Sequence, residues 1–197
     1  MPELKENINF SYLHFRRYAE LFLILICSPV FLLVFVLTAI WIKIDSRGNV
    51  LFCQIRPGKD EQLFKIYKFR SMYQDSDSSF LTLNNDPRIT KSGRFIRKYR
   101  IDELPQIFNI IKGDMSLIGP RPVPVNLLPL YKEHINQYEM RHLIRPGITG
   151  LAQIRQGYTS SIEQERRKLK YDLLYIKSIS CKTDMAILLQ TIKVLKK

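Results

Sequence analysis

The sequence contains few cysteines, and their placement excludes two common classes of small protein. Cys27, Cys53 and Cys181 are odd in number, far apart, and nowhere arranged as a Cys-x-x-Cys pair. This pattern argues against a structural zinc site and against the disulfide framework of a secreted domain. A chain of 197 residues needs no disulfide or metal cross-links to fold, because it can bury roughly 70% of its unfolded surface. We therefore expect a reducing compartment.

Acidic residues are also scarce relative to basic ones. Asp and Glu total 18 against 31 Lys and Arg, which gives a formal net charge of +13. Nucleic acid or a membrane surface are the partners that such an excess first suggests. Hydrophobic residues make up 46% of the chain, a share that excludes a disordered or low-complexity protein. The length predicts one domain, or one domain with an appendage.

One stretch lacks charge altogether. No charged residue occurs among the 22 residues from Leu21 to Ile42. As a straight helix this segment would be roughly 33 Å long, enough to cross the hydrocarbon core of a bilayer. A signal peptide fits poorly, because the apolar run is too long and no small-x-small cleavage site follows it before Lys43. The segment therefore predicts a membrane anchor.

Ser28-Pro29 interrupts this anchor about one third of the way along it. Proline kinks a helix, and the serine hydroxyl can satisfy a carbonyl that the kink frees. Cations flank both ends of the segment: Arg16 and Arg17, then Lys43 and Arg47. The positive-inside rule draws both ends to the cytoplasmic side, which a bent, re-entrant helix would satisfy. A spanning helix with a tolerated proline is the alternative that these residues leave open.

The rest of the chain has the pattern of an α+β domain that is mainly α. Residues 50–69 alternate in part and break at 56–60, which predicts two short strands joined by a turn. Residues 74–88 predict a loop, and 117–124 are too rich in proline for a regular helix. Helices are expected over 93–99, from Asp102 to Gly113, over 126–143 and over 161–177. We expect an anchoring segment over residues 1–48 and a compact domain over 49–197.

The C-terminal segment 183–197 predicts an amphipathic helix. Its apolar face carries Met185, Leu188, Leu189, Ile192 and Leu195, and lysines gather near its end. A helix that packs on the core with a solvated basic end fits this pattern. An in-plane membrane helix whose lysines meet anionic lipid fits it equally.

The residues that could carry chemistry concentrate between Asp86 and Gly150. Asp102 and Glu103 adjoin at the start of an expected helix, where an N-cap aspartate and a dipole-favoured glutamate are ordinary structural features. Arginines surround the pair in the sequence: Arg88, Arg94, Arg97, Arg100, Arg121 and Arg145. Guanidinium groups bind phosphate oxygens bidentately, and carboxylates with phosphate are the usual ligands of Mg²⁺. An aspartate beside bound phosphate can also attack phosphorus and form an acyl phosphate.

Taken together, these segments resemble the bacterial sugar transferase family, the monotopic phosphoglycosyl transferases, in their minimal catalytic form. The resemblance runs from about Tyr18 to Leu195 and is strongest over 102–106 and 113–122, with Asn109 between them. Supporting matches lie over 54–58, 65–72, 86–90 and 145–150, and at Asp172 and Tyr175.

The resemblance implies transfer of a sugar phosphate from a UDP-sugar to a polyprenol phosphate, undecaprenyl phosphate being the expected acceptor. UMP is released, and the product starts the assembly of a bacterial glycan, capsule or glycoprotein. The family further implies a catalytic domain, residues 49–197, on the cytoplasmic face of the bacterial inner membrane. The partners are then the two substrates and membrane lipid, not nucleic acid. A homodimer is left open.

The resemblance also implies roles for single residues. Asp102 matches the nucleophile that takes up the phosphosugar covalently, and Glu103 matches the carboxylate that helps hold Mg²⁺. Ser28-Pro29 matches the break of a re-entrant helix. The candidates for substrate or phosphate binding are Arg97, Arg121, Arg145, Asp172, Lys68 and Arg70.

The sequence departs from the family pattern in two places. Arg100-Ile101 precede Asp102, where a small hydroxyl residue followed by Leu is more usual, so an extra positive charge lies near the nucleophile. Leu151 replaces a common aromatic, and 153–157 lack the usual Gly-Arg ending, which leaves the sugar open. Two alternatives also stay open: direct transfer between two bound substrates without a covalent adduct, and a non-catalytic, membrane-anchored basic binding protein.

Overall fold

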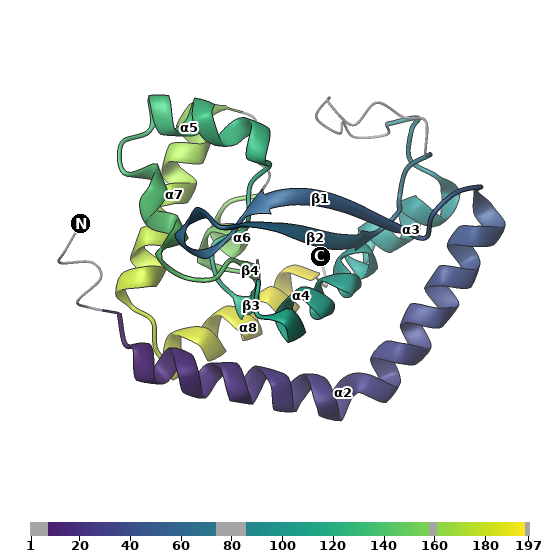
Figure 1. Ribbon diagram of the computed structural model, residues 1–197, viewed down its shortest axis with the longest axis horizontal. Helices are drawn as coiled ribbons and strands as arrows, with labels where there is room; N and C mark the ends of the chain where they lie inside the picture. Colours follow the sequence, from purple (N-terminus) through teal and green to yellow (C-terminus); the bar gives the residue numbers. More distant parts are fainter. Residues whose placement is uncertain (1–7, 74–85, 158–160, 196–197) are drawn as a thin grey trace.

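A computed structural model of the chain describes residues 8–73, 86–157 and 161–195. It is α+β and mainly helical, as the sequence predicts, with two small sheets of two strands each among the described residues. Figure 1 shows the long helix α2 along two sides of the molecule, with the remaining elements packed inside its bend.

Helix α2 (Phe10–Asp45) contains the whole uncharged segment and is the one described helix long and apolar enough to cross a membrane. The Asn9 side chain caps its first turn by accepting from the amide of Tyr12 at 2.9 Å. Pro29 lies inside the helix, and Figure 1 shows that α2 turns sharply about midway. The Ser28 hydroxyl donates to the carbonyl of Leu25 at 2.7 Å, the side-chain-to-backbone bond that the sequence predicts next to a proline kink.

Both halves of α2 are fastened to the same domain. In the first half, Arg16 donates to Asp184 at 3.1 Å and Glu20 accepts from the amide of Leu117 at 3.0 Å. At the far end, Ile42 is fully buried in a cluster with Phe69 and Ile96. Asp45 accepts from the amide and hydroxyl of Ser92, each at 2.8 Å. The two ends of the apolar helix therefore lie against one body.

The two strands expected over 50–69 are present. β1 (Leu51–Pro57) pairs antiparallel with β2 (Leu63–Phe69), in a register that sets Leu51 opposite Phe69 and Arg56 opposite Phe64. A 3-10 turn, Lys59–Glu61, joins them, and Asp60 has a left-handed φ of 51°. The Arg-Pro-Gly break in the alternation thus falls at the end of β1, as expected.

The helix expected from Asp102 to Gly113 is split. α3 (Lys91–Lys98) is followed by a 3-10 helix, Ile101–Gln106, and only then by α4 (Ile107–Lys112), which ends at Gly113 with φ 92°. Pro105 has no amide hydrogen to donate within the first turns. Arg100, with a left-handed φ of 56°, precedes the 3-10 helix in the N-cap position. The prediction of one continuous helix from Asp102 is therefore wrong, and Asp102 lies inside the 3-10 helix and does not occupy an N-cap position.

A short parallel pair of strands brings the proline-rich segment 117–124 next to the segment 145–150. β3 (Ser116–Ile118) pairs with β4 (Gly147–Thr149), with Ser116 opposite Gly147. The backbones approach so closely that a Cβ on Gly147 would lie 2.1 Å from the amide nitrogen of Gly119. Only glycine fits there, and the loop that follows β3 is held against β4.

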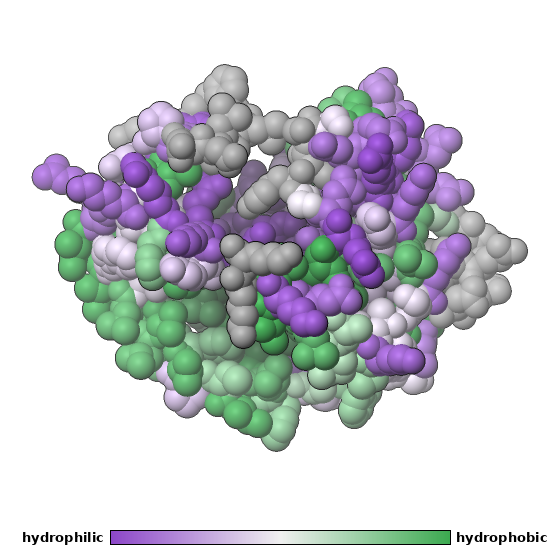
Figure 2. All heavy atoms as spheres, turned by 180° about the vertical axis from the view of Figure 1, so that it is seen from behind, coloured by the Kyte–Doolittle hydropathy of each residue, from purple (hydrophilic) through white to green (hydrophobic). Residues whose placement is uncertain are grey.

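Helices complete the domain: α5 (Leu128–His134), α6 (Leu151–Arg155), α7 (Ile162–Lys177) and α8 (Cys181–Leu195), with 3-10 turns at Val125–Leu127 and Tyr138–Leu143. In α8, Ile187 is buried in the core, whereas Met185, Leu189 and Ile192 are more than half exposed. The helix thus packs on the core by one face and leaves an apolar stripe uncovered. Figure 2, the view from behind, shows hydrophobic side chains gathered along the lower and left margins, where α2 runs.

Candidate active site

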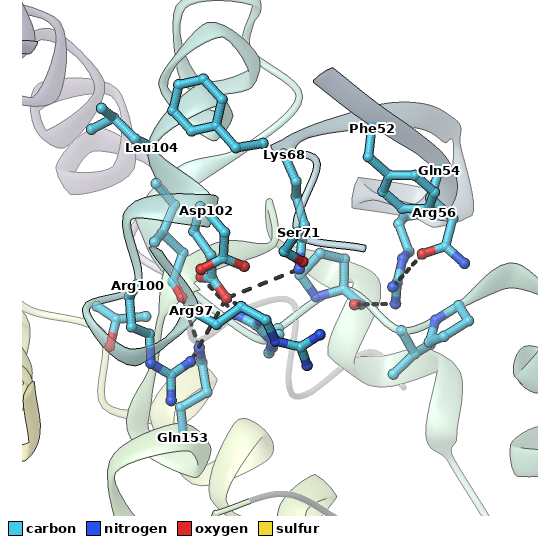
Figure 3. A pocket seen from close by; sticks show the side chains of 18 of the residues that line it. Phe52, Gln54, Arg56, Lys68, Ser71, Arg97, Arg100, Asp102, Leu104 and Gln153 are labelled. Atoms are coloured by element: carbon cyan, nitrogen blue, oxygen red, sulfur yellow. Dashed lines mark hydrogen bonds and ion pairs between the residues drawn. The ribbon is translucent and has the colours of Figure 1, made fainter. Parts of the chain in front are cut away.

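An open cleft of about 1500 Å³ lies between the β1–β2 hairpin, the 3-10 helix at 101–106 and the loop after β3. Side chains of α2 and α8 also line it, so the cleft extends from the polar domain to the apolar helix. Figure 3 shows Lys68, Arg97, Arg100 and Asp102 turned toward one another within it. Its polar lining includes Arg56, Lys68, Arg97, Arg100, Asp102, Glu103 and Arg121.

Glu103 is buried and fixed by arginine. Both of its carboxylate oxygens accept from Arg121, one of them at 3.1 Å from Nη1. Lys68 Nζ and Arg100 Nη1 lie 4.0 and 3.7 Å from Oε1. Burial alone would raise the pKa of Glu103, but the surrounding cations, Arg121 foremost, outweigh burial and lower it to about 2. Glu103 is therefore an anion that holds Arg121 in place.

Asp102 differs from its neighbour. Within the part of the chain that the structure describes, its carboxylate makes no hydrogen bond and no ion pair. Burial and the charge of Glu103 raise its pKa, and the nearby Lys68, Arg97 and Arg121 lower it less. The side chain is thus a carboxylate of raised basicity with both oxygens available to a ligand in the cleft.

The cations around this pair outnumber the carboxylates. Burial and the charge of Arg121 lower the pKa of Lys68 to about 8 and that of Arg56 to about 10. Cations that lower one another's pKa in a buried site are stabilised when an anion binds near them. The cleft therefore suits a ligand that carries several negative charges, as a diphosphate does.

The loop after β3 sets the position of Arg121. The backbone carbonyl of Arg121 accepts a hydrogen bond from Arg141 Nη2 at 2.9 Å. The next carbonyl, that of Pro122, accepts a hydrogen bond from Arg56 Nη1 at 3.0 Å. Arg141 is itself buried, with Nη1 3.0 Å from Glu165 and Nη2 2.8 Å from Asp172. Arg121, which binds Glu103, is thus held in position by a buried network of ion pairs.

The structure brings most of the predicted site residues together, but not all. Asp102, Glu103, Arg97, Arg121 and Lys68 line one cleft. Arg70 also lines it, but its guanidinium donates to the carbonyl and the hydroxyl of Ser46, at 2.8 and 2.9 Å. Arg70 therefore fastens the end of α2, at a distance from Glu103.

Arg145 and Asp172 are placed outside the cleft lining. Arg145 lies near Arg17 of α2, whose pKa its charge lowers. Asp172 is buried in α7 as a counter-ion of Arg141. It reaches the site only through the contact between Arg141 and Arg121, and so it supports the loop without touching the cleft.

Two further residues line the site although the sequence assigned them no role beyond lying in matching segments. Arg56 lies at the end of β1, and Gln106 ends the 3-10 helix. Arg56 lies in the strand that pairs with the strand carrying Lys68. This pairing is the signal that could have placed Arg56 in the cleft.

The donor set for a metal ion can be judged from the carboxylates. No group of three or more His, Cys, Asp or Glu side chains forms a metal cluster within residues 8–73, 86–157 and 161–195. Mg²⁺, however, is usually held by one or two carboxylates together with substrate phosphates and water. The available oxygens of Asp102 and the ionised Glu103 fit that arrangement. Glu103 would have to exchange part of its contact with Arg121 for the metal.

Comparison with known proteins shows which family the chain resembles. The model of the family described as bacterial sugar transferase matches residues 11–197. A UDP-N-acetylgalactosamine-undecaprenyl-phosphate N-acetylgalactosaminephosphotransferase of Aeromonas hydrophila is 42% identical over 184 residues, which are 92% of this chain and 44% of that protein. A UDP-glucose:undecaprenyl-phosphate glucose-1-phosphate transferase of Klebsiella pneumoniae is 42% identical over 178 residues, 88% of this chain and 37% of the relative.

A shorter relative matches from end to end. The exopolysaccharide production protein PSS of Rhizobium leguminosarum bv. phaseoli is 41% identical over 186 residues, 90% of this chain and 91% of that protein. This chain spans less than half of the two longer relatives. The match of the family model over nearly the whole sequence, and the similarity to proteins of both sizes, show that the chain belongs to the bacterial sugar transferase family.

Proposed function

We propose that the protein transfers a sugar 1-phosphate from a UDP-sugar to a polyprenol phosphate, through a covalent adduct on Asp102. The observation that carries this proposal is the carboxylate of Asp102, which makes no hydrogen bond or ion pair with the described residues and lies in a cleft lined by cations. Two relatives named as undecaprenyl-phosphate sugar phosphotransferases support undecaprenyl phosphate as the acceptor.

In the first half-reaction, an Asp102 oxygen attacks the sugar-side phosphorus of the UDP-sugar. The bond from that phosphorus to the bridging oxygen breaks, and UMP leaves with the electron pair. Burial of Asp102 favours this step because it raises the basicity of the carboxylate. Arg97, Arg121 and Lys68 offset the negative charge that gathers on the phosphate oxygens.

In the second half-reaction, a phosphate oxygen of the polyprenol phosphate attacks the same phosphorus. The acyl–phosphate bond breaks, Asp102 recovers its carboxylate, and a polyprenyl diphosphosugar is released. One carboxylate thus serves a water-soluble donor and a lipid acceptor in turn, which predicts ping-pong kinetics.

Mg²⁺ is the cofactor that we propose, held by Glu103 and by phosphate oxygens of the substrate. When bound, it supplies positive charge to the phosphate groups. Glu103 also keeps Arg121 beside the substrate, and its carboxylate would be shared between Arg121 and the metal.

We also propose that α2 enters and leaves the membrane by one face, with the domain on the cytoplasmic side. Both ends of α2 are held by the same domain, through Arg16 and Asp184 at one end and Asp45 and Ser92 at the other. A straight spanning helix would carry these ends to opposite sides. The uncovered stripe of α8, with Met185, would lie on the same membrane surface.

The test of the reaction is a trapping experiment on the purified full-length chain. A panel of UDP-sugars labelled in the sugar-side phosphate is mixed with the enzyme and quenched without acceptor. We expect stoichiometric label on the protein with UMP release, and loss of both in Asp102→Asn. Label that persists in this variant would refute Asp102 as the nucleophile.

The same experiment separates the alternatives. Direct transfer between two bound substrates predicts UMP release only when undecaprenyl phosphate is present, and no label on the protein. A non-catalytic basic binding protein predicts no UMP release under any condition, and equal ligand affinity for the wild type and Asp102→Asn. A homodimer is not needed for any step proposed here.

A further inference from the structure

The hairpin of β1 and β2 carries Lys68 into the cleft, and it is a sheet of two strands. β1 pairs with one edge of β2 over its full length, from Leu51 opposite Phe69 to Pro57 opposite Leu63. A two-stranded hairpin is at best marginally stable in water by itself. The position of Lys68 therefore depends on what binds the other edge of β2.

The side chain of Asn109 binds that edge. Its Oδ1 accepts a hydrogen bond from the backbone amide of Tyr67 at 3.1 Å, and its Nδ2 donates one to the backbone carbonyl of Lys65 at 2.7 Å. The orientation of the side-chain amide follows from these partners, because a backbone N–H donates and a carbonyl accepts. A side-chain amide offers the same donor and acceptor as a peptide group, so Asn109 takes the place of a neighbouring strand along β2.

Asn109 belongs to the helical segment that also carries the carboxylates of the site. α4, which contains Asn109, follows the 3-10 helix of Asp102 and Glu103 without a break. Three residues after Asn109, Lys112 Nζ donates a hydrogen bond to the hydroxyl of Tyr67 at 2.6 Å. α4 therefore contacts β2 at two points, and Asn109 fastens that strand to the segment of Asp102.

The backbone of Asn109 also holds the start of the third segment of the site. Its carbonyl accepts hydrogen bonds from the amides of Gly113 and Asp114 at 3.1 and 3.0 Å, and its Nδ2 donates to Asp114 Oδ2 at 3.2 Å. This turn leads into β3 and then to the loop of Arg121. The segments that line the cleft around Asp102 thus meet at one asparagine.

Asn109 itself does not touch a substrate. It is 0% exposed, so no ligand in the cleft reaches it. Lys68, by contrast, follows Tyr67 in β2 and is turned toward Asp102 in Figure 3, with its Nζ 4.0 Å from Glu103 Oε1. Any effect of Asn109 on the reaction must therefore pass through the groups that it positions.

We propose that Asn109 is a positioning residue that sets Lys68 for the transfer. Its side-chain amide holds β2 at the distance from the 3-10 helix at which Lys68 Nζ meets the phosphate that Asp102 attacks. The inference rests on the proposed function, in which Lys68 offsets the negative charge of the phosphate oxygens.

The expected effect of losing this amide follows from the role of Lys68. A displacement of about 1 Å at a reacting site can cost about 100-fold in rate. Lys68 acts on charge that gathers in the transition state, so its displacement lowers kcat and leaves KM largely unchanged. A residue that only stabilises the fold would not produce this pattern in the molecules that remain folded.

Variants of the full-length protein in detergent test this role. Asn109→Ala removes both side-chain bonds to β2, and Asn109→Ser is a second variant that retains a polar group at the position. Asn136→Ala is the matched control, because Asn136 is exposed between α5 and the 3-10 turn at Tyr138–Leu143 and loses the same amide. Lys68→Met supplies a second background, in which there is no ammonium group to position. Circular dichroism gives the unfolding midpoint of each protein.

UMP release from the most active UDP-sugar, with undecaprenyl phosphate present, gives kcat and KM. We expect Asn109→Ala to lower kcat about 10- to 100-fold and to change KM for the UDP-sugar by less than about threefold. Asn109→Ser should show the same pattern with a smaller factor, and Asn136→Ala should match the wild type. In the Lys68→Met background, Asn109→Ala should lower kcat by less than about twofold, because the effects of residues that act together do not add.

Hydrogen exchange measures the positioning without any substrate. Peptides that cover β2 should exchange faster in Asn109→Ala than in the wild type, whereas peptides that cover α7 should exchange alike in both proteins. If the wild type releases UMP from no UDP-sugar, the proposed function fails. Exchange in β2 then still shows whether Asn109 holds the strand.

Contrary results would overturn the proposal. An unchanged kcat in folded Asn109→Ala shows that Lys68 needs no such support, and unchanged exchange in β2 shows that the strand does not depend on Asn109. An equal loss of kcat in the wild-type and Lys68→Met backgrounds assigns Asn109 to the fold alone, as does unfolding of both Asn109 variants at the assay temperature. A raised KM with an unchanged kcat would place its effect on substrate binding.

Discussion

Arg141 donates a hydrogen bond from Nη2 to the backbone carbonyl of Arg121 across 2.9 Å. Through this contact a side chain buried among α7 residues fixes the loop from which Arg121 reaches Glu103. Glu165 and Asp172 supply the counter-charges, at 3.0 and 2.8 Å. Arg121 is therefore positioned in the cleft by a buried network of ion pairs around Arg141.

Loss of Arg141 should destabilise the whole domain. In Arg141→Met, Glu165 and Asp172 stay buried and lose their arginine counter-charge, with Lys168 still nearby, and breaking a buried pair costs about 3 to 5 kcal/mol. We expect a lower urea midpoint in detergent by circular dichroism. Arg155→Met, at an exposed position, should change the free energy of unfolding by less than about 0.5 kcal/mol. Equal midpoints for the two variants would contradict the role of the network.

Removal of the metal should abolish transfer, and Glu103 should set the affinity for Mg²⁺. We expect chelation to stop UMP release and added Mg²⁺ to restore it. In Glu103→Gln the Mg²⁺ concentration for half-maximal activity should rise, and kcat should fall about 100-fold, because the variant loses a ligand charge and loosens Arg121. Glu163→Gln, on the exposed start of α7, should titrate like the wild type. An unchanged Mg²⁺ midpoint in Glu103→Gln would remove it from the metal site.

Stability should fall on mild acidification because of His142. Its Nδ1 lies 3.4 Å from Glu61 Oε1, but burial, and then the charge of Arg141, lower the pKa of His142 to about 4. An unfolded histidine has a pKa near 6.5, so between about pH 6.5 and 4 the unfolded chain binds a proton that the folded chain does not. The free energy of unfolding should therefore drop by up to about 3 kcal/mol across this window.

His142→Gln provides the comparison for the pH effect. Denaturant titrations from pH 7.5 to 4 should show a shallower decline in the variant than in the wild type, with parallel curves above pH 7. Identical slopes in both proteins across the acidic range would show that His142 is not held neutral.

Pro29 should matter for topology more than for catalysis itself. Single cysteines at positions 10 and 47, in a background without native cysteines, can be labelled with a membrane-impermeant maleimide. We expect both to react from the cytoplasmic side in the wild type. Pro29→Ala removes a kink worth about 3 kcal/mol, so a fraction of molecules should expose position 10 on the opposite side. Opposite labelling in the wild type would exclude the re-entrant path.

The local elements were predictable because their signals are local. The alternation in 50–69 and its break at 56–60 predict β1 and β2, and the patterns over 161–177 and 183–197 predict α7 and α8 to within two residues of their observed starts. Pro105 shows the limit of this approach, because the pattern around it is helical while the backbone forms a 3-10 turn. Periodicity does not distinguish the two.

The site was predictable where chemistry and sequence adjacency coincide, as at Asp102 and Glu103. It was not predictable where tertiary contacts decide. In the sequence Asp172 is one of several charged residues in α7. Its ion pair with Arg141, which is a tertiary contact, shows that it supports the loop that carries Arg121.

The contacts at both ends of α2 also decide what happens when this helix is removed from the protein. Arg16 is buried and donates hydrogen bonds to Tyr175 and Asp184, and Ile42 is buried in the cluster with Phe69 of β2 and Ile96 of α3. A fragment that began at residue 49 would expose these surfaces to water, so we expect it to aggregate and not to yield a soluble enzyme. Removal of α2 and loss of the native state are then one event, and the apolar helix acts as a structural part of the domain.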